Sequence, residues 1–269
     1  MQMNIEAPGH DGTLYLLSAF TETPEGGNPA GVWIGDQLPE SEAMQRIASD
    51  VGFSETVFLA PREGALRIAR YYSPEAEVPF CGHATIAAGV QLGALQGDGR
   101  YRFDTAAGAI MVDVRNSGTR PEASLTSVEP RHSVVEPLLL EQALGALGWK
   151  ANELDPAIPP AMAFAGAWHL VVAVREAERL AQLDYHFARL KALMLDANLT
   201  TLQLVRRVSA DVFLARNPFP VGGVIEDPAT GAAAAALGGY LRDARLIEAP
   251  ASILIRQGEA MGRPSRLHV

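Results

Sequence analysis

Two glycine-led segments are candidates for binding a small anion. Gly82 follows Cys81 and precedes an Ala-rich run, and Gly231 follows Thr230 and precedes another. The first backbone N–H groups of a helix are unpaired and partly positive, so they bind carboxylates and phosphates. Glycine lets such a ligand approach the backbone closely. Either segment alone is typical of an ordinary helix start, but the matching pair favours a site for a small carboxylate.

The first of these segments also places a thiol beside an imidazole. A histidine near a helix N-terminus is disfavoured as the imidazolium, so we expect a neutral His83 that can donate, accept or shuttle a proton. The same helix end would favour a Cys81 thiolate, which leaves a thiol-dependent hydrolase or transferase as an alternative. The structural interpretation is that Cys81 is a small buried apolar residue and His83 a hydrogen-bonded loop histidine. We favour the structural interpretation for Cys81 and the functional one for His83.

Three further polar residues could take part in proton transfer. Glu55 begins an apolar, strand-like run, and a carboxylate in apolar surroundings can act as a general acid or base near neutral pH. At a sheet edge or in a turn, the same Glu55 would simply be solvated. Asp227 precedes a proline, which favours turn geometry; it could orient His83, although capping the next helix is the commoner role. Asn28 could hydrogen-bond a catalytic carboxylate or stabilise its own turn.

The composition excludes several classes of function. The formal net charge is −9 and no basic run is present, which argues against a nucleic-acid partner. Cys81 is the only cysteine, so an intramolecular disulfide and a Cys-rich zinc site are excluded. The histidines show no ligand spacing, and we expect no metal. The start of the sequence lacks a signal-peptide pattern and no window resembles a membrane span, so we expect a cytoplasmic protein with no membrane partner.

Short strand-like runs and a few helical runs follow one another irregularly, which predicts an α+β fold rather than a doubly wound sheet. The predicted strands are 14–20, 31–35, 57–59, 66–72, 101–103, 109–114, 123–128, 168–174, 202–208, 212–215 and 252–257. The predicted helices are 41–51, 84–95, 136–147, 185–195 and 232–241. We expect Ser41 to cap the first of these helices. Helices 84–95 and 232–241 lack a polar face, which is typical of a helix surrounded by a sheet.

An internal similarity suggests that the chain has two similar halves. Residues 70–88 and residues 216–236 both run from an arginine through a strand, a loop with proline and an acid, and a Gly-led, Ala-rich helix. A boundary between about 115 and 130 would separate them. We expect halves over residues 1–120 and 121–269, with the C-terminal segment as a candidate to cross back into the first.

Taken together, these segments resemble the PhzF-like family of phenazine biosynthesis-like isomerases and epimerases, which shares the diaminopimelate epimerase fold. The matching segments occur in family order across nearly the whole chain. They are residues 20–21, 27–32, 54–58, 79–85, 216–218, 226–231, 257–258 and 262–265. The most specific are the motifs CGHAT at 81–85 and EDPATG at 226–231.

The resemblance implies two pseudo-symmetric halves, each a mixed or antiparallel sheet wrapped round a central buried helix, with the active site in the cleft between them. It implies a cofactor-independent isomerase, similar to trans-2,3-dihydro-3-hydroxyanthranilate isomerase, that acts on a small carboxylate and forms a homodimer. Glu55 matches the catalytic acid/base that removes a proton from an activated carbon and returns it elsewhere. His83 and Asp227 match catalytic residues that assist and position the substrate. The substrate-binding candidates are Asn28, Ser54, Gly82, Ala84, Thr230, Gly231 and Ala232.

Two departures limit what the resemblance implies. Ala232 stands where the family usually has serine, so a hydroxyl is lost while the backbone N–H remains. This predicts weaker carboxylate binding, another substrate, or a non-catalytic metabolite-binding protein with the same fold. Cys81 has no cysteine partner in the second half, which excludes the two-thiol racemisation of the other epimerase branch.

Overall fold

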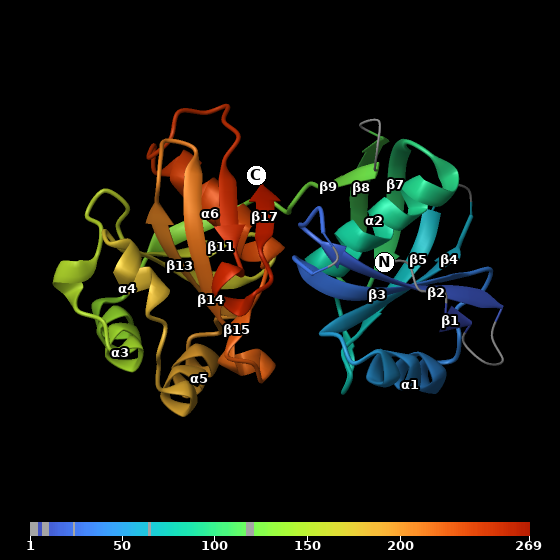
Figure 1. Cartoon of the computed structure of the whole chain (residues 1–269), viewed down its shortest axis with the longest axis horizontal. Coiled ribbons are helices and arrows are strands. Elements are labelled where there is room, and N and C mark those ends of the chain that lie inside the picture. The colour runs from blue at the N-terminus through green and yellow to red at the C-terminus, as the bar shows by residue number, and fades with distance from the viewer. Residues whose placement is uncertain (1–4, 7–10, 24, 64–65, 117–120) are drawn as a thin grey trace. The chain divides into compact units, whose positions relative to one another are not determined.

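The computed structural model describes residues 5–6, 11–23, 25–63, 66–116 and 121–269, and the chain forms two units with a similar plan (Figure 1). The first unit comprises Met1–Pro24 and Asn28–Thr126, and the second comprises Glu25–Gly27 and Ser127–Val269. The chain thus passes from the first unit to the second after Thr126.

The first unit is built on a mixed sheet in the order β1-β2-β3-β4-β5-β7-β8-β9, with β6 alongside β5. Neighbouring strands are antiparallel except for the pairs β3/β4 and β5/β7, which are parallel. The strands are β1 (Ile5–Glu6), β2 (Gly12–Ala19), β3 (Asn28–Gly35), β4 (Glu55–Pro61), β5 (Leu66–Tyr72), β6 (Glu77–Val78), β7 (Gly99–Thr105), β8 (Gly108–Asn116) and β9 (Pro121–Leu125).

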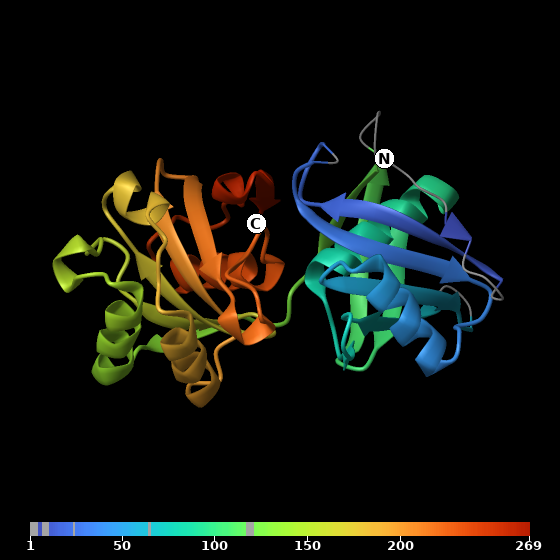
Figure 2. The same ribbon diagram turned by 60° about the horizontal axis from the view of Figure 1, so that its bottom comes forward.

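Helix α2 (Gly82–Gln96) is the central helix of this unit, and strands on several sides contact it (Figure 1). Small residues allow the close approach: a Cβ at Gly93 would lie 2.5 Å from Val114 Cγ1. Helix α1 (Ser41–Val51) lies on the outer face of the sheet, where Met44 packs in a separate apolar cluster (Figure 2). Its bounds match the prediction, but its N-cap is Glu40 and not Ser41.

The second unit repeats the plan with a sheet in the order β10-β11-β12-β13-β14-β16-β17, and β15 alongside β14. Here β12/β13 and β14/β16 are the parallel pairs. The strands are β10 (Arg131–Val134), β11 (Ala161–Phe164), β12 (Trp168–Ala173), β13 (Thr201–Arg207), β14 (Val212–Pro218), β15 (Glu226–Asp227), β16 (Leu254–Gln257) and β17 (Ser265–His268). The C-terminal strands β16 and β17 therefore belong to the second sheet.

Helix α6 (Gly231–Asp243) is the central helix of the second unit. A Cβ at Gly239 would lie 2.3 Å from Pro130 Cβ, so this helix too packs closely against its surroundings. Outside the sheet, α3 (Pro137–Leu147) and α5 (Phe187–Asp196) pack in a second apolar cluster, with α4 (Ala177–Ala181) nearby (Figure 2). Short 3-10 turns are η1 (Ala151–Glu153), η2 (Pro220–Gly222) and η3 (Glu259–Met261).

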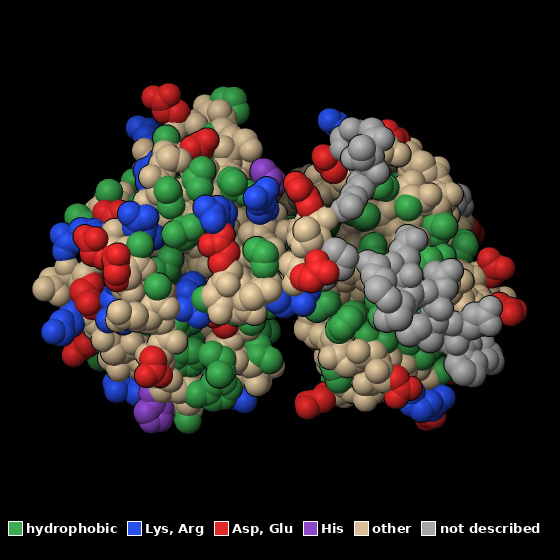
Figure 3. All heavy atoms as spheres, viewed as in Figure 1, with side chains coloured by type: hydrophobic (Ala, Val, Ile, Leu, Met, Phe, Trp, Pro, Cys, Tyr) green, Lys and Arg blue, Asp and Glu red, His purple; other side chains and the backbone are tan. Residues whose placement is uncertain are grey.

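The α+β prediction with two pseudo-symmetric halves and two central buried helices is confirmed. The strand predicted to reach residue 128 ends at Leu125, and β10, β11 and β17 were not predicted. On the face shown in Figure 3, acidic and basic side chains are interspersed over the second unit. Among the described residues, no helix combines the length and the apolar character needed to cross a membrane.

Candidate active site

Glu55 is the first residue of β4, an inner strand of the first sheet. It lies opposite Ala30 of the parallel strand β3, and β5 flanks β4 on the other side. Alternation along a strand places Glu55 on the same face as Val57 and Leu59, which pack in the core around α2. The Glu55 side chain is 21 % exposed. The carboxylate therefore lies on the inner face of the sheet and not at its edge.

His83 is the second residue of α2 and contacts Glu55 directly. Its Nε2 lies 3.4 Å from Glu55 Oε2 and 3.3 Å from Ser54 Oγ. On the other side of the ring, Nδ1 lies 3.3 Å from Cys81 Sγ. The start of α2 and the start of β4 thus bring together two residues that are 28 positions apart in the sequence.

Burial lowers the pKa of His83, and this effect outweighs the opposing influences of the Glu55 carboxylate and of a hydrogen bond to the Pro29 backbone. The neutral imidazole is therefore favoured near pH 7, as the sequence predicted. The main cause, however, is desolvation by the surrounding core. A neutral imidazole can stabilise either protonation state of a neighbouring carboxyl group. One tautomer donates a hydrogen bond to the carboxylate, and the other accepts one from the carboxylic acid.

Glu55, Cys81 and His83 each offer one ligand atom, and these atoms lie within 4.8 Å of one another. The donor set would suit a thiophilic divalent cation. However, the sulfur lies nearer Nδ1 (3.3 Å) than Nε2 (3.8 Å), whereas the carboxylate lies beside Nε2. The three groups are possible metal ligands, and the contact between the carboxylate and the ring also suits proton transfer.

The remaining candidates in this unit contribute mainly through the backbone or through position. Asn28 is buried at the start of β3, so it is a strand residue rather than the turn residue that one interpretation expected. Ala84 is fully buried in the core, which leaves only its backbone for a ligand. Gly82 begins α2, and a Cβ placed on it would have no heavy atom within 4 Å. Nothing in the described fold requires a glycine there, which is consistent with space kept for a ligand.

In the second unit, the short strand β15 and the start of α6 bring together Asp227, Thr230, Gly231 and Ala232. Thr230 is the N-cap residue, yet its side chain makes no capping bond. Its hydroxyl donates instead to Asp227 Oδ2 at 2.5 Å. The predicted capping role thus belongs by position to Thr230 and not to Asp227.

Gln257 is a residue of this site whose role the sequence did not reveal. It is the last residue of β16 and is buried, and its side chain bonds to both Asp227 and Thr230. The sequence signal was present, because Gln257 opens one of the segments that match the family. Its partners lie 27 and 30 residues away, so local pattern could not assign them.

A second feature that was not predicted is a cluster of buried polar side chains on β12, β13 and β14. His169 Nδ1 lies 2.8 Å from Thr201 Oγ1, and Asn217 Nδ2 donates to the same oxygen at 3.3 Å. All are essentially inaccessible to solvent. Burial lowers the pKa of His169 to about 3, so this imidazole is neutral and structural.

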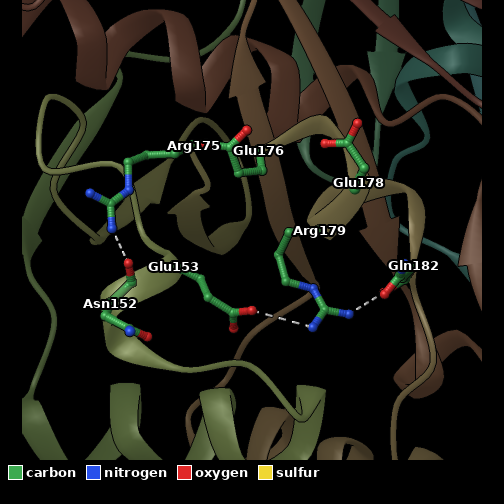
Figure 4. Close-up of a pocket in the computed structure, with 7 residues that line it drawn as sticks. All are labelled: Asn152, Glu153, Arg175, Glu176, Glu178, Arg179 and Gln182. Carbon is green, nitrogen blue, oxygen red and sulfur yellow. Dashed lines mark hydrogen bonds and ion pairs between the residues drawn. The ribbon is translucent and has the colours of Figure 1, made fainter.

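A surface hollow on the second unit involves different residues (Figure 4). Arg179 Nη1 lies 3.6 Å from Glu153 Oε1, and Arg179 Nη2 donates to the Gln182 carbonyl at 3.1 Å. Arg175 donates to the Asn152 carbonyl. The arginines of the hollow are thus engaged by neighbouring protein groups, and no candidate site residue lines it.

Comparison with known proteins identifies the family. The sequence profile of the family described as "Phenazine biosynthesis-like protein" matches residues 17–269. The trans-2,3-dihydro-3-hydroxyanthranilate isomerase of Pseudomonas fluorescens is 31% identical over 253 residues, covering 93% of this chain and 87% of that protein. An uncharacterized isomerase of Deinococcus radiodurans is 31% identical over 268 residues, covering 94% and 84%.

Solved structures agree with this assignment. A phenazine biosynthesis protein of the PhzF family from Bacillus anthracis superposes with a TM-score of 0.83 at 25% identity, covering 95% of this chain and 88% of that one. A hydroxyproline epimerase from Agrobacterium vitis, with a TM-score of 0.62 at 12% identity and coverage of 99% and 84%, shares the fold. The chain therefore belongs to the phenazine biosynthesis-like protein family and is, at the level of that family, a PhzF-like isomerase.

Proposed function

We propose that this isomerase moves a proton between two carbons of a small unsaturated carboxylate related to trans-2,3-dihydro-3-hydroxyanthranilate, with Glu55 as the acid/base. The contact between Glu55 Oε2 and His83 Nε2, 3.4 Å long, is the observation that carries the proposal. In this contact, a carboxyl group that can gain or lose a proton lies beside a buried imidazole. The imidazole can donate a hydrogen bond to the carboxylate or accept one from the carboxylic acid. The named relative from Pseudomonas fluorescens supplies the substrate class.

The proposed reaction conserves atoms and electrons. The Glu55 carboxylate takes a proton from an sp³ carbon of the substrate, and the C–H electron pair forms a new double bond. The existing double bond shifts, and the proton held by Glu55 is delivered to the carbon at its far end. No redox change occurs, so the step needs no cofactor. General acid–base catalysis of this kind contributes about 10²–10⁴-fold to a rate.

His83 and Ser54 fix the geometry of the acid/base in this proposal. Ser54 Oγ lies 3.3 Å from His83 Nε2, and the Pro29 backbone also bonds to the ring. These contacts hold the imidazole against the Glu55 carboxylate. A preoriented partner reduces the reorganisation needed during proton transfer.

The first backbone N–H groups of α2 in the first unit, and those of α6 in the second, are each proposed as binding groups for a carboxylate. Neither Cys81 nor Thr230, the two N-cap residues, makes a side-chain capping bond. Backbone N–H groups at a helix start favour an anion electrostatically and by hydrogen bonding. Gly82, Gly231 and Ala232 would contribute these groups, and Asp227 would orient the bound substrate through its polar neighbours.

Kinetics with trans-2,3-dihydro-3-hydroxyanthranilate test the proposal. Glu55→Gln should reduce kcat at least about 10³-fold, because the amide cannot take the proton, while the circular dichroism spectrum stays unchanged. Glu75→Gln is the matched control: Glu75 is exposed in the turn after β5, and its removal should leave kcat within about twofold. Near-normal turnover by Glu55→Gln would refute the role of Glu55.

A thiol mechanism predicts a different outcome. Cys81 is buried beside His83, so its replacement by alanine should change kcat far less than Glu55→Gln does. Loss of all turnover in Cys81→Ala, with Glu55→Gln active, would favour the thiol-dependent alternative. The homodimer and the cytoplasmic location stay predictions from the family resemblance.

A further inference from the structure

We propose that Gln257 is a positioning residue that keeps the Thr230 hydroxyl turned toward Asp227, and so prevents Thr230 from capping α6. The N–H groups at the start of α6 then stay available for the substrate carboxylate. This inference rests on the proposed function, because it concerns the same carboxylate-binding helix end.

Threonine at an N-cap normally accepts a hydrogen bond from the second or third N–H of its helix, which stabilises the helix by about 1 kcal/mol. Thr230 stands at this position, with an extended backbone (φ −109°, ψ 90°), but its side chain makes no such bond. A stabilising contact that the local sequence offers is therefore not made. Some other interaction must hold the hydroxyl in a different orientation.

The Gln257 side chain supplies that interaction. Its Nε2 donates to Thr230 Oγ1 at 3.1 Å and to the Asp227 carbonyl at 2.8 Å. Its Oε1 accepts from the Thr230 backbone N–H at 3.3 Å. One amide thus binds the backbone N–H and the hydroxyl of Thr230, and also the backbone carbonyl of Asp227. Gln257 is 1% exposed, so water does not compete for these bonds.

The directions of these bonds determine where the hydroxyl proton goes. Because Thr230 Oγ1 accepts from the Gln257 amide, its single proton is directed to Asp227 Oδ2, 2.5 Å away. The short bond to a carboxylate is of the strong, charge-assisted kind. By fixing the orientation of the Thr230 hydroxyl, Gln257 therefore has two effects. The Asp227 carboxylate receives a hydrogen bond, and the start of α6 is left without a side-chain cap.

The residue after Gln257 fixes the local path of the backbone. Gly258 has a φ of +76°, and a Cβ there would lie 2.3 Å from the Arg263 carbonyl oxygen and 2.6 Å from the Pro228 carbonyl oxygen. Only glycine allows the chain to pass so close to the loop that carries Asp227. Gln257 itself is paired with Ser265 of β17. The backbone that carries the Gln257 side chain is thus fixed by the sheet and by this close approach.

The test measures carboxylate binding without catalysis. The full chain, labelled with ¹⁵N, is titrated with 2-aminobenzoate, a stable aromatic carboxylate, and the Gly231 and Ala232 amide shifts are followed by NMR. Gln257→Met, close in shape but unable to make the three bonds, should raise the dissociation constant about tenfold. Gln203→Met is the matched control: Gln203 is a fully buried glutamine of β13 with no partner for its amide among the described residues, and this change should leave binding within about twofold.

A second substitution separates positioning from general damage to the fold. Adding Thr230→Val to Gln257→Met removes the hydroxyl that would cap α6, so the double variant should bind at least about threefold more tightly than Gln257→Met alone. Equal or weaker binding by the double variant would overturn the proposal, as would wild-type binding by Gln257→Met.

Failure of the proposed function would look different. Glu55→Gln should bind 2-aminobenzoate like the wild type while losing turnover, and adding Gln257→Met should weaken binding in that background as well. If Glu55→Gln turns over substrate normally, the assignment of Glu55 as the acid/base is wrong. The role of Gln257 is decided separately, by the binding of 2-aminobenzoate.

Discussion

The two units share one scaffold but carry different side chains at matching positions. The matching strands are β4 and β13, each the second strand of the first parallel pair in its sheet. The first residue of β4 is Glu55, opposite Ala30, and the first residue of β13 is Thr201, opposite His169. The second residue of the central helix is His83 in one and Ala232 in the other. The position that we propose for proton transfer in the first unit thus belongs to a buried, neutral hydrogen-bond network in the second.

Other parts of the scaffold are retained in both units. In each unit, a bidentate ion pair joins the two strands that precede the central helix. Arg70 of β5 pairs with Glu77 of β6 in the first unit, and Arg216 of β14 pairs with Glu226 of β15 in the second. Both pairs brace the hairpin that leads into the Gly-led helix. The hairpin and the helix start are thus common to both units, whereas the residues at the positions of Glu55 and Thr201 differ in chemistry.

The largest expected effect comes from exchanging the residues at this position. Glu55→Thr should lower kcat at least about 10³-fold with the fold intact, because the acid/base is lost. Thr201→Glu should prevent stable folding, because it buries a carboxylate where Thr201 is only 1% exposed. Kinetics and thermal unfolding measure the two effects. A folded, active Thr201→Glu would show that the two positions do not differ in the way we describe.

The second prediction concerns the pH dependence of stability. Burial lowers the pKa of His169 to about 3, whereas an unfolded histidine titrates near 6.5. Below pH 6.5 the unfolded state binds the extra proton, so the free energy of unfolding should fall as the pH drops from 6.5 toward 3, by at most about 1.4 kcal/mol per unit from this residue. His83, whose pKa is also lowered, acts in the same direction.

Urea unfolding at pH 7, 6 and 5 tests this assignment. His169→Gln should flatten the pH dependence, because glutamine does not titrate in this range and so binds no extra proton in the unfolded state. His268→Gln, at an exposed position on β17, is the control and should leave the slope unchanged. The same slope in His169→Gln as in the wild type would mean that the buried cluster of the second unit is not the source.

A third prediction separates ligand space from packing along α2. Gly82→Ala should raise KM about tenfold while the melting temperature stays the same or rises, because the added methyl meets no protein atom and alanine favours a helix. Gly93→Ala should do the reverse, since its methyl would lie 2.5 Å from Val114 Cγ1 and overpacking costs about 1–3 kcal/mol. An unchanged KM in Gly82→Ala would remove Gly82 from the binding site.

The smallest expected effect concerns the start of α6. Ala232→Ser restores the hydroxyl that the family usually has at this position, and one added hydrogen bond to the carboxylate should lower KM about two- to tenfold. The kcat should change less than twofold. Steady-state kinetics with trans-2,3-dihydro-3-hydroxyanthranilate provide the measurement, and a raised KM would indicate that this chain has adapted to a different carboxylate.

Much of this arrangement could be predicted where the signal was local. Helix α1 has the predicted bounds because its apolar residues follow a helical period, and α2 and α6 were predicted as buried because they lack a polar face. The motifs at 81–85 and 226–231 predicted the two helix starts. Strands β10 and β17 are each four residues long, and β10 is exposed throughout while β17 is exposed at alternate residues. They carry too little pattern to be distinguished from loop.

The parts of the site that could not be predicted depend on contacts between distant residues. Ser54 lies 29 residues from His83 in sequence, and Gln257 lies 27 residues from Thr230. Such residues come together only when the strands pair and the central helices pack against them. Likewise, Gln203 and His169 sit in strand-like runs whose burial on both faces is set by the sheet and the helices around it.

Solvent-deuterium incorporation tests the central claim most directly. Wild type and Glu55→Gln are incubated in D₂O with trans-2,3-dihydro-3-hydroxyanthranilate and a panel of small carboxylates, and ¹H NMR follows the loss of carbon-bound protons. We predict that wild type introduces deuterium at carbon in at least one compound and that Glu55→Gln introduces none. Deuterium incorporation by Glu55→Gln at the wild-type rate would contradict the assignment of Glu55 as the acid/base.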